Sequence, residues 1–271
     1  MFSPYYAWAR RGQAVTNPDN FCSLNVALYS RHANRWAMTE RGARDCSRSQ
    51  THFNIGPSQL HWDGQALVMD IDEVCVPFPR RIQGRVRVHP QQLFNFGVNL
   101  EPQGLHRWGP IAPSARVEVQ LQHPGQSWQG HAYLDSNEGD EPIDRPFKEW
   151  DWSRSLMANG DTAVLYDLQL KNGEHPVLAL RFDQQGRVHD FEPPAVQGLR
   201  RTKWAMARRM RSDGPVQVKQ QLEDTPFYQR AVLESVLLGE NVESFHETLH
   251  TARLVSPVVQ AMLPWRMPRR F

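Results

Sequence analysis

The sequence is poor in cysteine, in net charge and in long apolar runs. Its three cysteines, Cys22, Cys46 and Cys75, stand too far apart for a CxxC metal or redox motif, so we expect small buried side chains rather than metal ligands. The 31 Lys and Arg residues nearly balance the 29 Asp and Glu residues, and a net charge of +2 provides no long-range field that would attract nucleic acid. No stretch reaches the run of about 18 apolar residues that spans a bilayer. The composition therefore argues against a metal centre, a nucleic-acid-binding protein and a transmembrane protein.

The beginning of the chain lacks the features of a secretory signal peptide. Aromatic residues between Phe2 and Trp8 precede the basic pair Arg10 and Arg11, whereas a signal peptide places its charges before an apolar segment and ends in a cleavage site. The reducing cytoplasm is therefore the expected location.

Helical periodicity is scarce, whereas alternation with a period of two residues recurs along the chain. Apolar and polar side chains alternate at 67–72 and at 116–121, which predicts strands with one solvated face. Turn residues at 63–64 and at 171–173 predict two hairpins. The segment 225–238 fits a strand better than a helix. This pattern is typical of an antiparallel all-β protein.

Two domains are expected from the length of the chain, because 271 residues suit two domains of roughly 130 residues each. A predicted strand ends in the turn residues at 123–125, and a new aromatic segment follows. The predicted domains are therefore 1–124 and 125–271. The density of hairpins favours two antiparallel β-barrels.

Nine tryptophans and six tyrosines supply rigid ring walls, and two short segments combine such rings with polar side chains. In an extended backbone His106 shares a face with Trp108, and Tyr133 shares a face with Asp135. A carboxylic acid among rings suits protonation of an unactivated carbon-carbon double bond, because burial raises its pKa and ring faces stabilise a carbocation. The alternative is structural: Asp135 would cap the turn donors at 136–139 and the rings would pack in a strand core.

A third alternation, at 147–154, places Trp150 and Trp152 on one face, which Lys148 and Arg154 extend. The two indole rings would either line a channel for an apolar substrate or fill the interior of a small barrel. We take Trp150 and Trp152 as candidate substrate-binding residues.

Six segments spread over nearly the whole length carry a family resemblance. They are FSPYYAW at 2–8, NVALY at 25–29, RWAMTERG at 35–42, GLHRWGPIAP at 104–113, GHAYLDSNEGDEP at 130–142 and MLPWRMPRR at 262–270. In sequence and in order they resemble the carotenoid 1,2-hydratases, also called hydroxyneurosporene synthases.

The resemblance implies two lipocalin-like β-barrel domains packed together, in an enzyme that adds water to the terminal double bond of an acyclic carotene of the neurosporene or lycopene type. It implies no cofactor and no metal. The functional positions of the family fall on Asp135 as the proton donor, with Tyr133 and Trp108 beside the carbocation that water captures. His106 would orient the water or return a proton to the acid.

The start of the chain departs from the family pattern. Family chains begin with an apolar strand upstream of the FSPYYAW segment, whereas this sequence starts within that region. We therefore expect the first domain to lack a strand and to expose a sheet edge.

Two other functions stay open from the sequence. The same fold would suit an enzyme that cyclises another polyene or catalyses a pericyclic step on it, or a carrier that binds an apolar ligand unchanged. Because a carotene is insoluble in water, we expect a cytoplasmic protein that contacts the inner face of the cytoplasmic or photosynthetic membrane peripherally. The basic stretch 200–211 is expected to form the solvated face of a strand pair. The candidate contacts with an anionic membrane are Trp265, Arg266, Arg269, Arg270 and Phe271.

Overall fold

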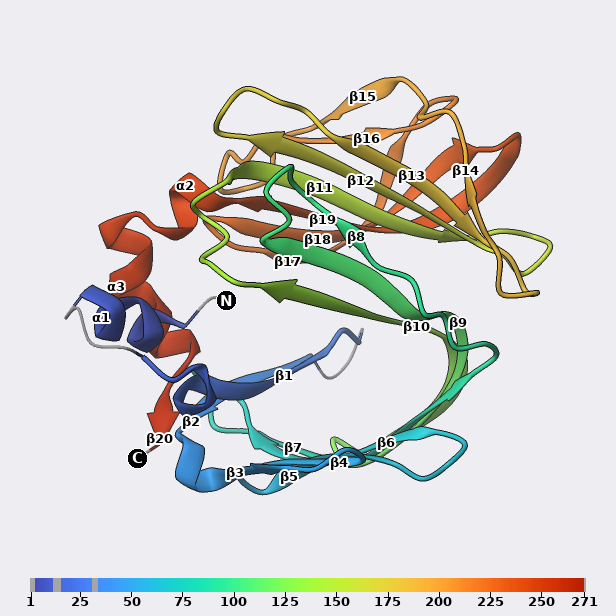
Figure 1. Ribbon diagram of the computed structural model, residues 1–271. Helices are drawn as coiled ribbons and strands as arrows, with labels where there is room; N and C mark the ends of the chain where they lie inside the picture. The colour runs from blue at the N-terminus through green and yellow to red at the C-terminus, as the bar shows by residue number, and fades with distance from the viewer. Residues whose placement is uncertain (1–2, 12–15, 31–33, 271) are drawn as a thin grey trace. The chain divides into compact units, whose positions relative to one another are not determined.

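Strands dominate the computed structural model of the chain, which describes residues 3–11, 16–30 and 34–270 (Figure 1). Nearly all strand pairs are antiparallel, and the short pair between β2 and β20 is parallel. The predicted all-β antiparallel class is confirmed. Within the described residues no sheet closes on itself, so the lipocalin-like barrels stay a prediction.

The chain divides into two compact units. Unit 1 comprises Met1–Pro90, Ala115–Ala132 and Gln260–Phe271, and unit 2 comprises Gln91–Ser114 and Tyr133–Val259. The turn at 123–125 connects strands β9 and β10, both of which have residues in the two units. The predicted division into 1–124 and 125–271 stays a prediction.

Two sheets contain the strands of the first half of the chain. In the described residues, an eight-stranded sheet has the order β10-β9-β7-β6-β5-β4-β3, with β8 beside β9, and a smaller sheet has the order β1-β2-β20. The strands are β1 (Cys22–Leu28), β2 (Arg35–Arg41), β3 (Cys46–Arg48), β4 (His52–Ile55), β5 (Ser58–Trp62), β6 (Leu67–Val74), β7 (Arg81–Pro90), β8 (Val98–Asn99), β9 (His106–His123), β10 (Gln126–Gly139) and β20 (Arg269–Arg270).

The core of unit 1 lies between these strands. Its buried members are Leu28, Ala37, Ile71, Cys75, Ile82, Val119 and Leu121. Cys75 is buried, as predicted, whereas Cys22 and Cys46 are half-buried, and the Cys22 thiol donates to the carbonyl oxygen of Asp19 at 3.4 Å. Beside the apolar core, a buried ion pair joins Arg41 to Glu73.

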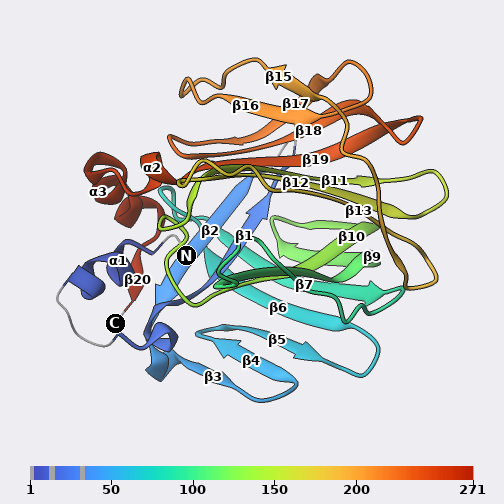
Figure 2. The same ribbon diagram turned by 45° about the horizontal axis from the view of Figure 1, so that its top comes forward.

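A seven-stranded antiparallel sheet forms the centre of unit 2. Its order in the described residues is β14-β13-β12-β11-β19-β18-β17, and a hairpin of β15 and β16 lies beside it (Figures 1 and 2). The strands are β11 (Phe147–Leu156), β12 (Thr162–Leu170), β13 (Val177–Phe182), β14 (Val188–Asp190), β15 (Val196–Leu199), β16 (Arg208–Arg211), β17 (Gln217–Asp224), β18 (Tyr228–Leu237) and β19 (Glu240–His250).

The hairpin of β15 and β16 covers one face of this sheet. Arg209 pairs with Glu149, and Arg211 pairs with Asp167 at 2.7 Å. Arg208 is only 8% exposed. The expectation that the stretch 200–211 is solvated is therefore wrong for β16, because Arg209 and Arg211 pair with carboxylates of the sheet and Arg208 donates to Gln221 and Gln229.

Local sequence signals predicted both hairpins correctly. Asp63 Oδ1 accepts hydrogen bonds from the backbone N–H groups of Gln65 and Ala66, and Gly64 takes the left-handed conformation that the turn between β5 and β6 requires. The hairpin of β12 and β13 is also confirmed, and so is the extended conformation at 228–237.

The helices are short and lie near the ends of the chain. They are α1 (Pro4–Arg11), η1 (Pro18–Phe21), η2 (Ala43–Asp45), α2 (Thr251–Leu254) and α3 (Pro257–Arg266). Phe2 and Phe271 lie outside the described residues. No helix in the described part of the chain is long and apolar enough to cross a membrane.

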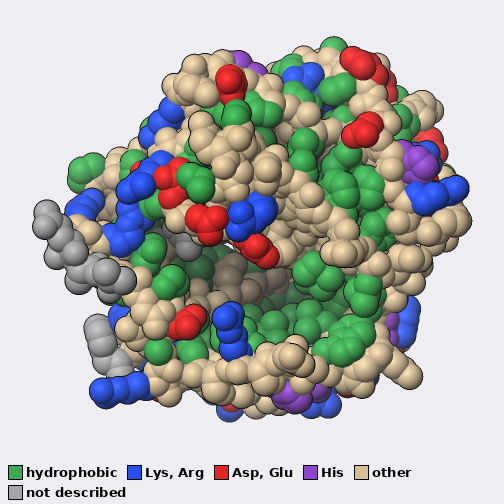
Figure 3. Space-filling view, in the orientation of Figure 1, with side chains coloured by type: hydrophobic (Ala, Val, Ile, Leu, Met, Phe, Trp, Pro, Cys, Tyr) green, Lys and Arg blue, Asp and Glu red, His purple; other side chains and the backbone are tan. Residues whose placement is uncertain are grey.

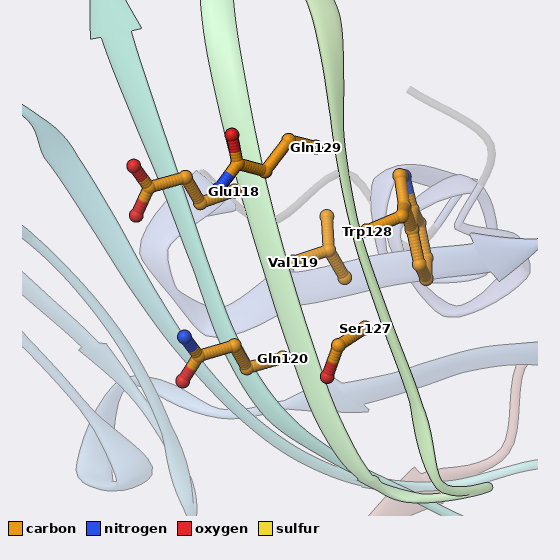
Figure 4. A pocket seen from close by; sticks show the side chains of 6 residues that line it. All are labelled: Glu118, Val119, Gln120, Ser127, Trp128 and Gln129. Carbon is orange, nitrogen blue, oxygen red and sulfur yellow. The ribbon is translucent and has the colours of Figure 1, made fainter.

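The surface does not concentrate charge of one sign on the face shown in Figure 3, where acidic and basic side chains are interspersed. A pocket of about 260 Å³ lies on β9 and β10 in unit 1 (Figure 4). It is lined by Glu118, Val119, Gln120, Ser127, Trp128 and Gln129. None of the predicted site residues lines it.

Candidate active site

Neighbouring strands bring three of the predicted residues together in unit 2. Trp108 on β9 donates its indole N–H to Asp135 Oδ2 at 2.8 Å, and the Tyr133 hydroxyl donates to the same oxygen at 3.2 Å. In the described residues no donor forms a hydrogen bond with Oδ1. The two hydrogen bonds therefore hold one oxygen of the carboxyl group in place.

The environment of Asp135 raises the pKa of its carboxyl group. Burial raises the pKa of Asp135, and the nearby Glu247 raises it further. The hydrogen bonds from Trp108 and Tyr133 act in the opposite direction, as does the positive charge of Arg154. Burial has the largest effect, so the net direction is upward.

The hydroxyl of Tyr133 remains a donor at all ordinary pH values. Burial, and then the charge of Asp135, raise the pKa of Tyr133 far above its usual value. The hydrogen bond from Tyr133 therefore becomes stronger when Asp135 loses its proton, since the acceptor is then charged.

Rings surround this carboxyl group. Trp108 is 1% exposed and meets Tyr166 edge to face at 5.8 Å, and Tyr133 lies 5.4 Å from Trp152. Trp150 joins the same group through Tyr166 at 6.2 Å. Trp150 and Trp152 thus share a face, as the alternation predicts, and both are buried. Their role in substrate binding stays a prediction.

His106 lies apart from the acid. Its Nε2 donates to the carbonyl oxygen of Glu141 at 3.0 Å, and its ring packs on Phe147 at 5.0 Å. The carboxylate of Glu101 lies 3.8 Å from its Nδ1. Among the described residues no hydrogen bond joins His106 to Asp135. The contacts of His106 fix the segment that follows β10 and show no direct part in proton transfer.

No three His, Cys, Asp or Glu side chains converge as a metal site in residues 3–11, 16–30 and 34–270. The donors at Asp135 are an indole N–H and a phenol hydroxyl, which suit hydrogen bonding to a carboxyl group.

Comparison with known proteins identifies the family. The family model described as carotenoid hydratase CrtC matches residues 1–271. The chain belongs to the carotenoid hydratase family. It is 55% identical over 273 residues to the acyclic carotenoid 1,2-hydratase of Rubrivivax gelatinosus, an alignment that covers 100% of this chain and 67% of that protein. The family resemblance seen in the sequence is confirmed, and the chain is a hydratase.

Two further relatives carry the same name. The acyclic carotenoid 1,2-hydratase of Thiocapsa roseopersicina is 46% identical over 272 residues, covering 99% of this chain and 67% of that protein. The acyclic carotenoid 1,2-hydratase of Cereibacter sphaeroides is 34% identical over 273 residues, covering 100% of this chain and 95% of that protein.

The site of this carotenoid hydratase contains residues that the sequence analysis left out of the predicted site. Tyr166 faces Trp152 across β12 and β11, and Glu247 faces Trp152 from β19. Arg154 was visible in the sequence as the next side chain on the face of Trp152. No local signal marks Glu247, since it reaches the site through strand pairing over about a hundred residues.

A second buried acid lies on the opposite face of the sheet of this hydratase. Burial raises the pKa of Asp151 to about 7. Its side chain accepts from the Thr248 hydroxyl at 2.5 Å and pairs with Arg209 at 3.3 Å. Because Asp151 and Trp152 are adjacent on β11, their side chains point to opposite faces. Asp151 is therefore separated by the sheet from the rings around Asp135.

Proposed function

We propose that this hydratase adds water to the terminal double bond of an acyclic carotene of the neurosporene or lycopene type, with Asp135 as the general acid. The names of the relatives support the substrate class. One observation supports the role of the acid: the ring side chains of Trp108 and Tyr133 both donate hydrogen bonds to one oxygen of the half-buried Asp135.

The proposed reaction has two steps. The proton of Asp135 passes to the less substituted carbon of the double bond, whose π electrons form the new C–H bond and leave a tertiary carbocation. Water then attacks that carbocation and releases a proton, which restores the acid. The net change is addition of one water molecule.

The rings would stabilise the intermediate. Each ring face near a carbocation contributes roughly 0.5 to 2 kcal/mol in a desolvated site. Tyr133 and Trp152 are in contact beside Asp135 and would supply such faces. The same rings offer apolar surface to the end of a polyene.

Two other functions can be separated from this one by product analysis. An enzyme acting on another polyene would leave lycopene and neurosporene unchanged. A carrier would bind them without converting them, but membership of a hydratase family argues against a carrier. Chromatography of the pigments after incubation separates the hydratase from both, and co-elution of unconverted pigment with the protein marks the carrier.

The hydrogen bond from Tyr133 provides a test of the site. Tyr133→Phe is expected to slow hydration about 10- to 100-fold, because a hydrogen bond to a charged group is worth about 1.5–3 kcal/mol and this one stabilises the carboxylate formed on proton transfer. Single-turnover hydration of neurosporene measures the effect.

Tyr166→Phe is the matched control for Tyr133→Phe. It removes a hydroxyl from the same group of rings, but Tyr166 forms no hydrogen bond with Asp135 among the described residues. Equal rates for Tyr133→Phe and the unaltered protein would contradict the proposed role of the hydrogen bond.

We also propose that the protein is cytoplasmic and reaches its substrate by peripheral contact of α3 with the inner face of a membrane. The apolar side chains Val258, Met262 and Trp265 follow the spacing of one helix face and are 71%, 42% and 72% exposed. Burial of such side chains in lipid is favourable.

The basic residues near the end of the chain contribute less to this surface than the sequence suggested. Arg269 pairs with the buried Glu40, so the expectation that it faces lipid headgroups is wrong. The Arg266 guanidinium lies 4.0 Å from the ring centroid of Trp36. Arg270 is exposed. The apolar face of α3 is therefore the main basis of the proposal.

Vesicle co-sedimentation tests the contact. The double variant Met262→Ser with Trp265→Ser is expected to lower partitioning onto neutral and anionic vesicles by about tenfold or more, since burial of one large apolar side chain is worth about 1.5–3 kcal/mol. Phe78→Ser is the control, because Phe78 is 73% exposed and lies on the segment between β6 and β7. Equal partitioning of the double variant and Phe78→Ser would contradict the proposal.

A further inference from the structure

Arg154 lies beside the acid without a carboxylate partner of its own. It follows Trp152 by two residues on β11, so both side chains are on the face that carries the rings. Its guanidinium carbon lies over the Tyr133 ring, 5.5 Å from the centroid, and 5.6 Å from the centroid of Phe245. None of the ion pairs in the described part of the chain includes Arg154.

A guanidinium group in this position remains charged. Burial lowers the pKa of Arg154, but arginine begins from so high a value that it stays protonated. The nearby Tyr133, Asp135 and Glu247 favour its charged form. Arg154 is half-buried, and a partly desolvated positive charge that is stacked on rings and has no direct ion pair is costly, so its position calls for an explanation.

Other charged groups on the same face are already paired. Glu247 accepts from Arg230 at 2.8 Å, and Arg230 also lies over the ring of Tyr228. Arg154 and Arg230 lie 5.6 and 5.3 Å from the Phe245 ring centroid. Glu247 therefore has a cation of its own, and Arg154 is left to interact with Asp135.

We propose that Arg154 is a positioning residue for the hydration. Its guanidinium holds the ring of Tyr133 in place, and its positive charge stabilises the carboxylate that forms when Asp135 gives up its proton. This inference rests on the proposed function. Tyr133 connects the two groups, because its hydroxyl donates to Asp135 while its ring faces the guanidinium.

The proposed role follows from the charge balance of the proton transfer. When the neutral acid protonates the alkene, a carboxylate and a carbocation appear in a half-buried site. Burial without a counter-charge would hold the proton too tightly for it to leave. The positive charge of Arg154 stabilises the carboxylate and so lowers the pKa that burial raises. The guanidinium is placed for this by its contact with the ring of Tyr133.

Several groups face Asp135 and set its titration. They are Trp108 on β9, Tyr133 on β10, Arg154 on β11, Tyr166 on β12 and Glu247 on β19. Arg154 is the positive charge among them, and Glu247 is the negative one. Removal of either charge should therefore shift the titration of Asp135, in opposite directions.

The rate of hydration as a function of pH tests the proposal. Hydration requires protonated Asp135, so the rate falls as the pH rises through its pKa. Arg154→Met is expected to move this alkaline limb to higher pH by about one unit and to lower the plateau rate about tenfold, because Asp135 becomes a weaker acid. Arg154→Lys keeps the charge and is expected to leave the limb close to its original position.

Two controls keep the result interpretable. Arg107→Met removes an exposed arginine of unit 2 that pairs with Asp140, and it should leave the limb unchanged. Glu247→Gln should move the limb to lower pH. Arg154→Gln replaces Arg154→Met as the test of the arginine if Arg154→Met does not fold. A purely structural role of Arg154 would lower the rate in Arg154→Met without moving the limb.

The outcomes separate this inference from the proposed function. If Asp135→Asn is inactive but the limb stays in place in Arg154→Met, or in Arg154→Gln where Arg154→Met does not fold, the role of Arg154 is overturned and the acid stands. If Asp135→Asn retains full hydration, the proposed function itself fails. Infrared titration of the Asp135 carboxyl group in the substrate-free protein should show the same shift without any assay of activity.

Discussion

Asp135→Asn is expected to lower the rate of hydration by about 10²- to 10⁴-fold, the contribution usual for a general acid. The amide keeps the shape of the side chain and still accepts the hydrogen bond from Trp108, but it has no acidic proton to give. Single-turnover conversion of neurosporene or lycopene, followed by chromatography, measures the loss.

Two acidic residues serve as controls for Asp135→Asn. Asp140→Asn changes an acid whose side chain is 59% exposed and pairs with Arg107, and it should retain nearly full activity. Asp151→Asn changes the buried acid on the opposite face of the sheet and should retain the pH profile of hydration. Loss of activity in Asp140→Asn equal to that in Asp135→Asn would contradict the assignment.

The stability of Asp135→Asn should also vary with pH in a defined direction. Since burial raises the pKa of Asp135 in the folded state, the folded protein binds this proton more tightly than the unfolded chain does. The contribution of this proton to the stability of the folded protein is complete below the unfolded pKa of about 3.9. It is lost as the pH rises through the folded pKa of Asp135. The melting temperature of Asp135→Asn relative to the unaltered protein should therefore increase with pH.

Arg41→Met is expected to destabilise unit 1 by about 3–5 kcal/mol, the cost of leaving one partner of a buried ion pair alone. Arg41 and Glu73 have side-chain exposures of 4% and 0%, and their charged atoms lie 2.8 Å apart. Glu73 also accepts from the Ser58 hydroxyl at 2.8 Å. Removal of the guanidinium leaves a carboxylate with one neutral donor in an apolar environment.

Arg81→Met is the matched control for Arg41→Met. Its partner is Asp72, at 2.7 Å, but the arginine side chain is 51% exposed, and exposed pairs are worth about 0–1 kcal/mol. Denaturant unfolding of both variants measures the difference. Equal losses in the two variants would contradict the importance of burial.

Local patterns predict much of the fold but little of the long-range pairing. Asp63 and Gly64 specify their hairpin because the turn uses only neighbouring atoms. Helix α3 was missed because its ten residues include Pro264 and mix apolar with basic side chains, which hides the helical period. The same lack of a local signal applies to Glu247, which joins the site through the pairing of β11 with β19.

In the candidate site, too, local spacing is predictable from the sequence and long-range contacts are not. The spacing of Tyr133 and Asp135 predicts one shared face, and the hydroxyl reaches the carboxyl group of the same strand. The spacing of His106 and Trp108 also places them on one face, but side chains two residues apart on a strand are separated by about 7 Å. Each reaches a different partner, Glu141 for His106 and Asp135 for Trp108, which spacing alone does not specify.

The protonation state of Asp135 tests the account most directly. We expect the infrared difference spectrum of the unaltered protein minus Asp135→Asn, at neutral pH and without substrate, to contain the C=O stretching band of a protonated carboxylic acid. Asp151 is present in both proteins, so its contribution cancels. A difference spectrum that contains only the bands of an ionised carboxylate would contradict the account, because a carboxylate has no proton to give to the alkene.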